Sequence, residues 1–278
     1  MLTNSELPNC LLKHNNELND YDFVLFHLYI SDHKYRTYYK NQRIKHPERV
    51  MIFDNSAYEF YVKNETLDLN AFCNAVCELR PDMYILPDVL MSKEKTLKGV
   101  NDFLLMFGET ISNVSPNSQP LAVAQGMSVD DLMECIEQYK SMNIKNIAIP
   151  FHNRFFKEIG ERVHPVIQQA FVNEYGQVLT EDHVYAMGRV KFMFEHKDIL
   201  RDFKWVHLLG SHCPLEKIFY REFNSMDTGY PVKCGIAGVE LGKETSKPNI
   251  IIDEFLNKNL SKKTCVLIKQ NVLKFKHM

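Results

Sequence analysis

The chain has 278 residues, of which 45% are hydrophobic, and it carries a formal net charge of −2. This length and apolar content are enough for one large core, since α/β barrels of about 250 residues fold as one domain. The near-zero charge excludes a globally basic nucleic-acid-binding protein, so any nucleic-acid surface has to be a local patch.

Short apolar runs predict seven strands that alternate with longer amphipathic segments. In chain order the strands are Phe23–Leu28, Val50–Phe53, Met83–Leu86, Leu121–Ala124, Asn146–Ile149, Trp205–Leu209 and, more weakly, Asn224–Met226. Alternation of strands with helices is typical of a parallel sheet. One further strand would complete eight, so we predict an α/β fold, a single TIM-type (β/α)8 barrel.

The segments between these strands predict helices. They are Leu67–Leu79, Lys93–Phe107, Val129–Met142, Phe155–Asn173, Glu181–Leu200, Leu215–Phe223 and Ile250–Leu256. Ser92 and Ser128 precede two of them as candidate N-caps, and Pro165 is expected to break the fourth. The polar stretch Gly108–Gln119 reads as a loop.

From Lys243 onward the chain turns polar and then ends in a basic, amphipathic tail. We expect a barrel over residues 1–242 and a short C-terminal extension, 243–278, that packs on it. The tail would be a capping helix or strand, and a nucleic-acid contact is the alternative.

Polar side chains follow four of the predicted strands. Asp54, Asp88 and Asp227 are acids, and Gln125 is an amide. In a parallel α/β barrel the active site lies at the carboxyl ends of the strands, where converging carboxylates raise one another's pKa. Glycosyl transfer uses such carboxylates. The residues alone therefore predict carboxylate chemistry at the barrel mouth, with helix caps and loop anchors as the alternative.

The seven cysteines are odd in number and scattered, which argues against a disulfide framework. Cys73 and Cys77 are four residues apart on one predicted helix face, but no second pair with ligand spacing accompanies them, so we predict no metal site. Cys213 beside His212 could act as a nucleophilic thiol. That reading is disfavoured because no third residue in the sequence would orient the histidine.

Four segments, in order, resemble motifs of the tRNA-guanine transglycosylase superfamily. Asp54–Glu59 (DNSAYE) resembles the Asp-Ser-Gly-Gly-aromatic-Gln motif, and Ala124–Gly126 resembles the Gln-Gly strand end. His207–Gly210 (HLLG) resembles the Tyr-Leu-Met-Gly segment. Asp227–Pro231 (DTGYP) resembles the nucleophile motif, in which proline follows the aspartate by four residues. The resemblance covers residues 23 to 240, and no cofactor is implied.

The resemblance implies a pentosyltransferase that exchanges guanine in a nucleic acid for a free 7-deazaguanine base. Asp227 would attack the sugar C1′ and hold the nucleic acid covalently, and Asp54 would act as general base on the incoming base or help to bind it. Asp88 would accept hydrogen bonds from the purine N1–H and exocyclic amine. Gln125 would donate to its O6.

The remaining base-binding positions carried over from the resemblance are Gly126, Tyr58, Ile149, His207, Leu208 and Gly210. Tyr58 and His207 would sandwich the base, and stacking of this kind contributes about 1–3 kcal/mol per base. Backbone groups around Ile149 and Leu208–Gly210 would complete the polar edge of the slot.

The sequence departs from the tRNA enzymes in several places. Beyond Asp227 it has only Cys234 and Cys265, so the zinc module of those enzymes is absent. Their Gly-Gly pair is Ser56-Ala57, and Lys233 stands where an arginine is expected. The segments SMDTGYP and LGKETSKP look more like the DpdA group, the phage and bacterial paralogues that place 7-deazaguanines such as preQ0 in DNA. We therefore favour DNA over tRNA as the substrate.

The segment 31–49 is a local basic patch that bears on the partner. It contains Lys34, Arg36, Lys40 and Arg43, and tyrosines are interleaved among them. Such a stretch can follow a phosphate backbone and stack bases, and Lys233 would add to it. The alternative is a solvated loop or helix face. Duplex DNA would also require the target nucleotide to be flipped out, which leaves room for a protein partner that opens the helix.

Three other functions stay open: the same exchange on tRNA, a non-catalytic nucleic-acid-binding subunit of a transglycosylase complex, and a carboxylate-dependent glycoside hydrolase. No apolar run approaches the roughly 18 residues of a membrane helix, and the first twenty residues lack the apolar stretch of a signal peptide. We expect a cytoplasmic protein (host cytoplasm if phage-encoded) without a membrane partner.

Overall fold

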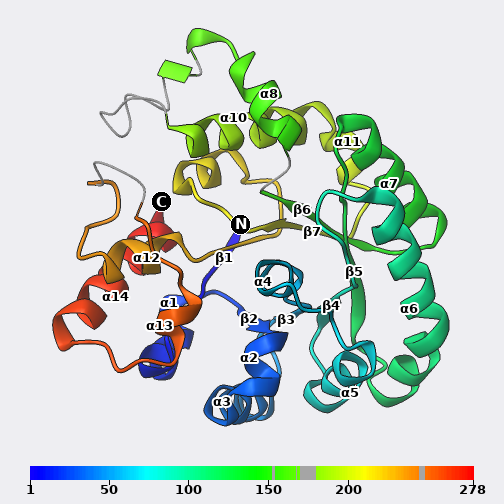
Figure 1. The fold of residues 1–278 in the computed structure, drawn as a ribbon, viewed down its shortest axis with the longest axis horizontal. Coiled ribbons are helices and arrows are strands. Elements are labelled where there is room, and N and C mark those ends of the chain that lie inside the picture. The colour runs from blue at the N-terminus through cyan, green and yellow to red at the C-terminus, as the bar shows by residue number, and fades with distance from the viewer. Residues whose placement is uncertain (152–153, 167, 170–179, 244–247) are drawn as a thin grey trace. The chain divides into compact units, whose positions relative to one another are not determined.

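The computed structural model describes residues 1–278 except 152–153, 167, 170–179 and 244–247. Eight parallel strands form one sheet in the order β1-β8-β7-β6-β5-β4-β3-β2. They are β1 Leu2–Ser5, β2 Asp22–Leu25, β3 Met51–Asp54, β4 Met83–Ile85, β5 Gln119–Val123, β6 Asn146–Pro150, β7 Trp205–Leu209 and β8 Ser225–Thr228. Helices follow the strands along the chain (Figure 1). The predicted class, an α/β fold of the TIM-barrel type, is confirmed.

The helices divide into those that follow β1 to β5 and those that follow β6 to β8. The first set is η1 Asn9–His14, α1 Asn15–Leu18, α2 Phe26–Ser31, α3 His33–Lys45, α4 Ala57–Lys63, α5 Leu69–Leu79, α6 Lys93–Val114 and α7 Val129–Ser141. The second set is α8 Arg154–Glu161, α10 Glu181–Glu195, α11 Lys197–Leu200, η2 Pro214–Phe219, α12 Tyr230–Ile236, α13 Asp253–Leu256 and α14 Lys262–His277. Within the described residues no helix has the length and apolar character needed to cross a membrane.

The strand that the sequence pattern did not reveal is β1. Its residues, Leu-Thr-Asn-Ser, show no apolar run, and it gains its strand conformation by pairing with β8 from Leu2↔Ser225 to Ser5↔Thr228. Pairing across more than two hundred residues of sequence leaves no local signal, so periodicity could not find it.

Several predicted elements differ from the observed ones in their bounds or in their type. The strand predicted to reach Leu28 ends at Leu25, where α2 begins. The predicted loop Gly108–Gln119 is helical up to Val114, because α6 continues until Ser115 caps it and buries Ile111 on the way. The segment Leu215–Phe223 forms the 3-10 helix η2 rather than an α-helix. Most of the segment predicted helical after Pro165 lies outside the described residues.

The chain divides into two compact units. The β4 unit comprises 21–150 and 203–206, and the β8 unit comprises 1–20, 151–202 and 207–278. The predicted boundary at residue 242 does not separate the units, because the C-terminal segment belongs to the same unit as β8. There α14 packs on α12 and β1, so the amphipathic tail forms a helix.

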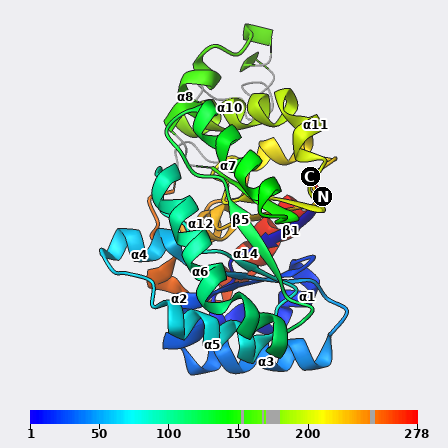
Figure 2. The ribbon, with the colours of Figure 1, turned by 90° about the vertical axis from the view of Figure 1, so that its right-hand side faces the viewer.

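The β4 unit has an aromatic core between its strands and helices. Phe53 of β3 stacks on Phe72 of α5 with ring centroids 5.5 Å apart, and Phe26 meets Phe72 edge to face. Full burial of each such side chain contributes about 1.5–3 kcal/mol. Helices α5, α6 and α7 lie on one side of the strands in this unit, and α6 runs alongside β5 (Figures 1 and 2).

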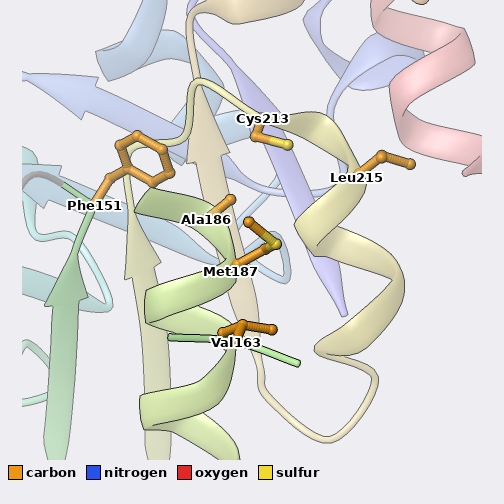
Figure 3. Close-up of a cluster of buried hydrophobic side chains, with 6 residues drawn as sticks. All are labelled: Phe151, Val163, Ala186, Met187, Cys213 and Leu215. Atoms are coloured by element: carbon orange, nitrogen blue, oxygen red, sulfur yellow. The ribbon is translucent and has the colours of Figure 1, made fainter. Parts of the chain in front are cut away.

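The β8 unit has a second apolar cluster, centred on the start of α10 and the segment after β7. Its buried members are Phe151, Val163, Ala186, Met187, Cys213 and Leu215 (Figure 3). These residues come from four separate parts of the chain. They therefore hold the loop after β7 against α10 next to the carboxyl end of β8.

Candidate active site

Asp227 is the third of the four residues of β8, in the β8 unit. Asp227 is in register with Asn4 of β1 and is only 3% exposed. Its Oδ1 accepts a hydrogen bond from the backbone N–H of Gly210 at 2.9 Å and lies 3.0 Å from Nε2 of His207. A backbone amide and an imidazole thus fix one carboxylate oxygen. Each donor comes from β7 or from the residue that follows it.

His207 supports Asp227 rather than a stacked base. Its ring is fully buried, and Nδ1 lies 2.8 Å from the hydroxyl oxygen of Ser225, the residue opposite it on β8. If the Ser225 hydroxyl donates to Nδ1, then Nε2 carries the proton and donates to Asp227. The stacking role expected for His207 therefore does not fit the structure, because burial leaves no ring face for a base.

Gly210 occupies the turn that directs an N–H at Asp227. Its φ is +66°, in the left-handed region that favours glycine, and the next residue, Ser211, is buried. Leu208, the other backbone position that the sequence suggested here, is fully buried in β7. The N–H of Gly210, which the resemblance assigned to the recognition of a purine, thus donates to the carboxylate of Asp227.

A second strand-end carboxylate, Asp88, lies after β4 in the β4 unit. Nδ2 of Asn55 donates to its Oδ1 at 2.8 Å, and Nε2 of Gln125 donates to its Oδ2 at 2.7 Å. The amide oxygens are fixed as well, since Asn55 accepts from the N–H of Ala57 and Gln125 from that of Met91. Asp88 and Gln125, which the sequence placed together, are in contact. Asn55 is a third member that the sequence did not single out.

Burial raises the pKa of Asp88, and the hydrogen bonds from Asn55 and Gln125 oppose that rise. The sequence suggested that neighbouring carboxylates would raise one another's pKa. Within this unit the principal cause is instead desolvation, which disfavours the charged form.

Asp54 caps the turn between β3 and α4. Its Oδ2 accepts from the backbone N–H of Ser56 at 2.8 Å, and Ser56 has a left-handed φ of 59°. The Ser56 hydroxyl lies 2.9 Å from Nδ1 of His27, which directly follows the start of α2. His27 is buried beside this turn, and the sequence pattern did not single it out, because it lies within the apolar run that predicted the strand Phe23–Leu28.

The remaining base-binding candidates of the β4 unit differ in exposure. Tyr58 on α4 is 59% exposed, whereas Ile149 is fully buried in β6. Gly126 has a steric role: a Cβ at this position would lie 2.3 Å from Cβ of Asp131. The end of β5 can therefore approach the first turn of α7 only with glycine at this position.

The basic segment forms helix α3, and its structure corrects the expected patch. Arg43 makes a two-point ion pair with Asp82, at 2.9 and 3.1 Å, and Asp82 directly precedes β4. Arg43 therefore lies at the amino-terminal end of that strand, away from the strand-end carboxylates. Lys40 pairs with Glu78 at 2.5 Å.

Two of the tyrosines interleaved in this segment, Tyr35 and Tyr39, are buried against the core and cannot stack bases. Of the predicted basic residues, Lys34 is exposed near the start of α3, Arg36 is partly exposed, and Lys233 lies on α12, two residues beyond Pro231. This leaves three candidates for a phosphate contact.

The structure adds no support for a metal pair at Cys73 and Cys77 or for a nucleophilic thiol at Cys213. In the part of the chain that the structure describes, no three His, Cys, Asp or Glu side chains are grouped to hold a metal ion. Asp182 lies 3.6 Å from His212, a partner that the sequence did not indicate. Burial nevertheless raises the pKa of the Cys213 thiol well above its usual value, which disfavours the nucleophilic thiolate.

No known family model matches the chain, and no curated protein is significantly similar to it in sequence.

Proposed function

We propose that the protein is a base-exchanging transglycosylase of the tRNA-guanine transglycosylase type, with Asp227 as its nucleophile. The observation that carries the proposal is the strand-end carboxylate whose Oδ1 is held by the Gly210 N–H and by His207. Among the described residues both of its hydrogen bonds go to Oδ1, so Oδ2 is the oxygen assigned to attack. The TIM-type fold and the order of the four resembling segments support the same reading.

The exchange has two displacements at the sugar C1′. In the first, Oδ2 of Asp227 forms a bond to C1′ while the C1′–N9 bond of guanine breaks, and guanine leaves with the electron pair and takes up a proton. In the second, a 7-deazaguanine loses its N9 proton and attacks C1′, and the ester bond to Asp227 breaks. We assign the proton transfers to Asp54. No net proton is consumed.

Base recognition is assigned to Asp88 and Gln125. Guanine and its 7-deaza analogues present N1–H and an exocyclic amine as donors and O6 as an acceptor. A carboxylate that accepts and an amide that donates complement this edge, and buried polar groups reject a base that leaves them unpaired. Because Asn55 and Gln125 hold both oxygens of Asp88, the acceptor is already oriented before a base arrives.

We favour DNA as the polymer, and a preQ0-like base as the incoming 7-deazaguanine. The support is the lack of the zinc-binding cysteines downstream of Asp227 and the resemblance of the nucleophile segment to the DNA-modifying group. Lys34, Arg36 and Lys233 are the residues to which we assign the phosphate contacts. Exchange on tRNA is the competing outcome of the test below.

The test measures incorporation of labelled guanine and labelled preQ0 into duplex DNA and, in parallel, into tRNA. The proteins compared are the wild type, Asp227→Ala and Asp198→Ala, which removes an exposed aspartate of α11 and serves as the matched control. We expect label in DNA with the wild type and the control, and none with Asp227→Ala. A denaturing gel should show a covalent protein–DNA adduct that needs Asp227.

Other results would decide against parts of the proposal. Label in tRNA alone would keep the mechanism and overturn the choice of DNA. Full incorporation by Asp227→Ala would remove Asp227 as nucleophile. Binding of DNA without label or adduct in any protein would favour the non-catalytic subunit, and hydrolysis of a sugar polymer would favour the glycoside hydrolase.

A further inference from the structure

A buried ion pair lies directly behind the loop that positions Asp227. Arg189 of α10 and Glu216 of η2 are both 0% exposed, and they form a two-point contact: Nε to Oε2 at 3.0 Å and Nη2 to Oε1 at 2.6 Å. All the residues of this arrangement belong to the β8 unit.

Arg189 also binds the backbone of the loop after β7. Its Nη1 donates to the carbonyl oxygen of Leu209 at 3.1 Å, and its Nη2 donates to that of Gly210 at 2.8 Å. A guanidinium group has five N–H donors in one rigid plane, and these contacts use four of them. The side chain therefore fixes two successive carbonyls on either side of the peptide N–H that donates to Asp227.

Glu216 extends the arrangement to β8. Its carboxylate accepts from the hydroxyl of Tyr220 at 3.0 Å and from the hydroxyl of Ser211. The carbonyl of Ser211 in turn accepts from the hydroxyl of Thr228, the residue next to Asp227, at 2.6 Å. Side-chain bonds thus tie the loop Leu209–Ser211 both to the ion pair behind it and to the strand that carries the carboxylate.

Stability alone does not explain why this pair is charged. Removing two charges from water is costly, and replacing a buried ion pair by apolar side chains of similar size is often neutral or stabilising. What the ion pair supplies, and apolar side chains cannot, is a set of directed hydrogen bonds to the Leu209 and Gly210 carbonyls. Glycine is conformationally permissive, so the backbone at Gly210 has more freedom than that of any other residue, and the contacts around it have to fix the loop.

We propose that Arg189 and Glu216 are positioning residues, which hold the loop Leu209–Ser211 so that the Gly210 N–H stays on Oδ1 of Asp227. Their effect on base exchange rests on the proposed function. Their effect on the Gly210 hydrogen bond does not, so the two can be measured separately.

The principal test is the double variant Arg189→Met/Glu216→Leu, which removes both charges and keeps the volume. The double variant leaves the hydroxyls of Ser211 and Tyr220 and the carbonyl of Gly210 without these buried partners, so we expect a Tm lower than that of the wild type and measure amide exchange well below it. Hydrogen exchange of the Gly210 amide, followed by NMR, should become about 10-fold faster, as expected when one hydrogen bond is lost. Incorporation of label should fall about 10- to 100-fold in kcat, with KM for the free base changed less than about twofold.

Two references and one control make the readout specific. Asp227→Ala removes the acceptor while the ion pair stays, and so defines the Gly210 exchange rate without that bond. Arg189→Lys keeps the charge but not the planar fork, and should give an intermediate Gly210 rate even if the double variant fails to fold. The control Lys191→Met/Glu195→Leu removes an exposed ion pair on the same helix and should change neither readout.

A folded double variant with wild-type protection of the Gly210 amide would overturn the proposal, and so would an Arg189→Lys protein with unchanged protection. A wild type that incorporates no label would instead count against the proposed function, because the Gly210 measurement decides the positioning role without any turnover.

Discussion

The carboxylates of Asp227, near the end of β8, and of Asp88, just after β4, belong to two parallel strands of the same sheet, yet their surroundings differ in kind. Asp227 accepts from a backbone N–H and an imidazole, both on one oxygen. Asp88 accepts from two side-chain amides, one on each oxygen, and desolvation raises its pKa. The two therefore are not interchangeable acids placed at strand ends.

This contrast separates a reacting group from a binding group. The carboxylate of Asp227 is held through one oxygen, by His207 of β7 and by the N–H of Gly210 just after β7. Its other oxygen is kept for bond formation, which suits a nucleophile. A carboxylate held through both oxygens by amides keeps its orientation, which suits an acceptor that reads hydrogen-bond donors. The following experiments test this distinction.

The largest effect is expected from Asp227→Asn, which preserves the acceptor for Gly210 but removes the nucleophilic charge. Incorporation should fall at least about 1,000-fold, which corresponds to about 4 kcal/mol in the activation free energy. Equilibrium binding of the free base should be unchanged. Single-turnover assays with saturating DNA measure the first quantity, and a residual rate within tenfold of the wild type would contradict the assignment.

Asp88→Asn should act on binding instead. Loss of hydrogen bonds to a charged acceptor costs about 1.5–3 kcal/mol, so the Kd for guanine should rise roughly 10- to 100-fold. The rate at saturating base should change much less. Calorimetric titration with guanine gives the Kd. If kcat collapsed while Kd stayed constant, the roles of the two acids would have to be exchanged.

Substitution of Gly210 and substitution of Gly126 should each lower the free energy of unfolding, but for different physical reasons. Gly210→Ala places a side chain in a left-handed conformation, which costs about 1–2 kcal/mol. Gly126→Ala places a Cβ 2.3 Å from Asp131, and overpacking costs about 1–3 kcal/mol. Asparagine tolerates the left-handed region, so Gly210→Asn should recover stability relative to alanine, whereas Gly126→Asn should not. Urea denaturation of the four variants checks this; equal behaviour at both positions would disprove it.

The raised pKa of Asp88 should appear in the pH dependence of stability. Above the usual value of 3.8 the unfolded chain has lost this proton while the folded protein still holds it. The contribution of Asp88 to the free energy of unfolding therefore falls as the pH rises from 3.8 through the folded-state pKa, and is constant beyond it. The difference between wild type and Asp88→Asn, from denaturation curves across this range, isolates the effect. If the free energy of unfolding of the wild type instead rose relative to that of Asp88→Asn as the pH increased, the predicted direction of the pKa shift would be wrong.

The smallest effects concern the basic residues. Lys40 and Glu78 form an exposed pair, and Lys40→Ala should lower the free energy of unfolding by less than about 1 kcal/mol without changing DNA binding. Lys233→Ala should instead weaken DNA binding and reduce the salt dependence by about one charge. Binding measured at several salt concentrations separates them, and equal salt slopes for both variants would reject Lys233 as a phosphate contact.

Local patterns predicted most of the fold and part of the candidate site. Seven strands and the alternating helices follow from apolar periodicity, and the juxtaposition of Asp88 and Gln125 follows from their places after neighbouring strands. The third member of that group, Asn55, was missed because an asparagine after an aspartate at a strand end looks like an ordinary turn residue.

The sequence by itself determined the α/β class, the strand ends and which acids stand there, because periodicity and strand-end chemistry are local properties. Tertiary structure decided the rest. It recruited the polar segment Leu2–Ser5 as a strand, directed His207 at Asp227 and buried Arg189 against Glu216 behind the loop. Each of these depends on partners distant in sequence, and the free energy of burial and hydrogen bonding that selects them exists only once the chain has folded.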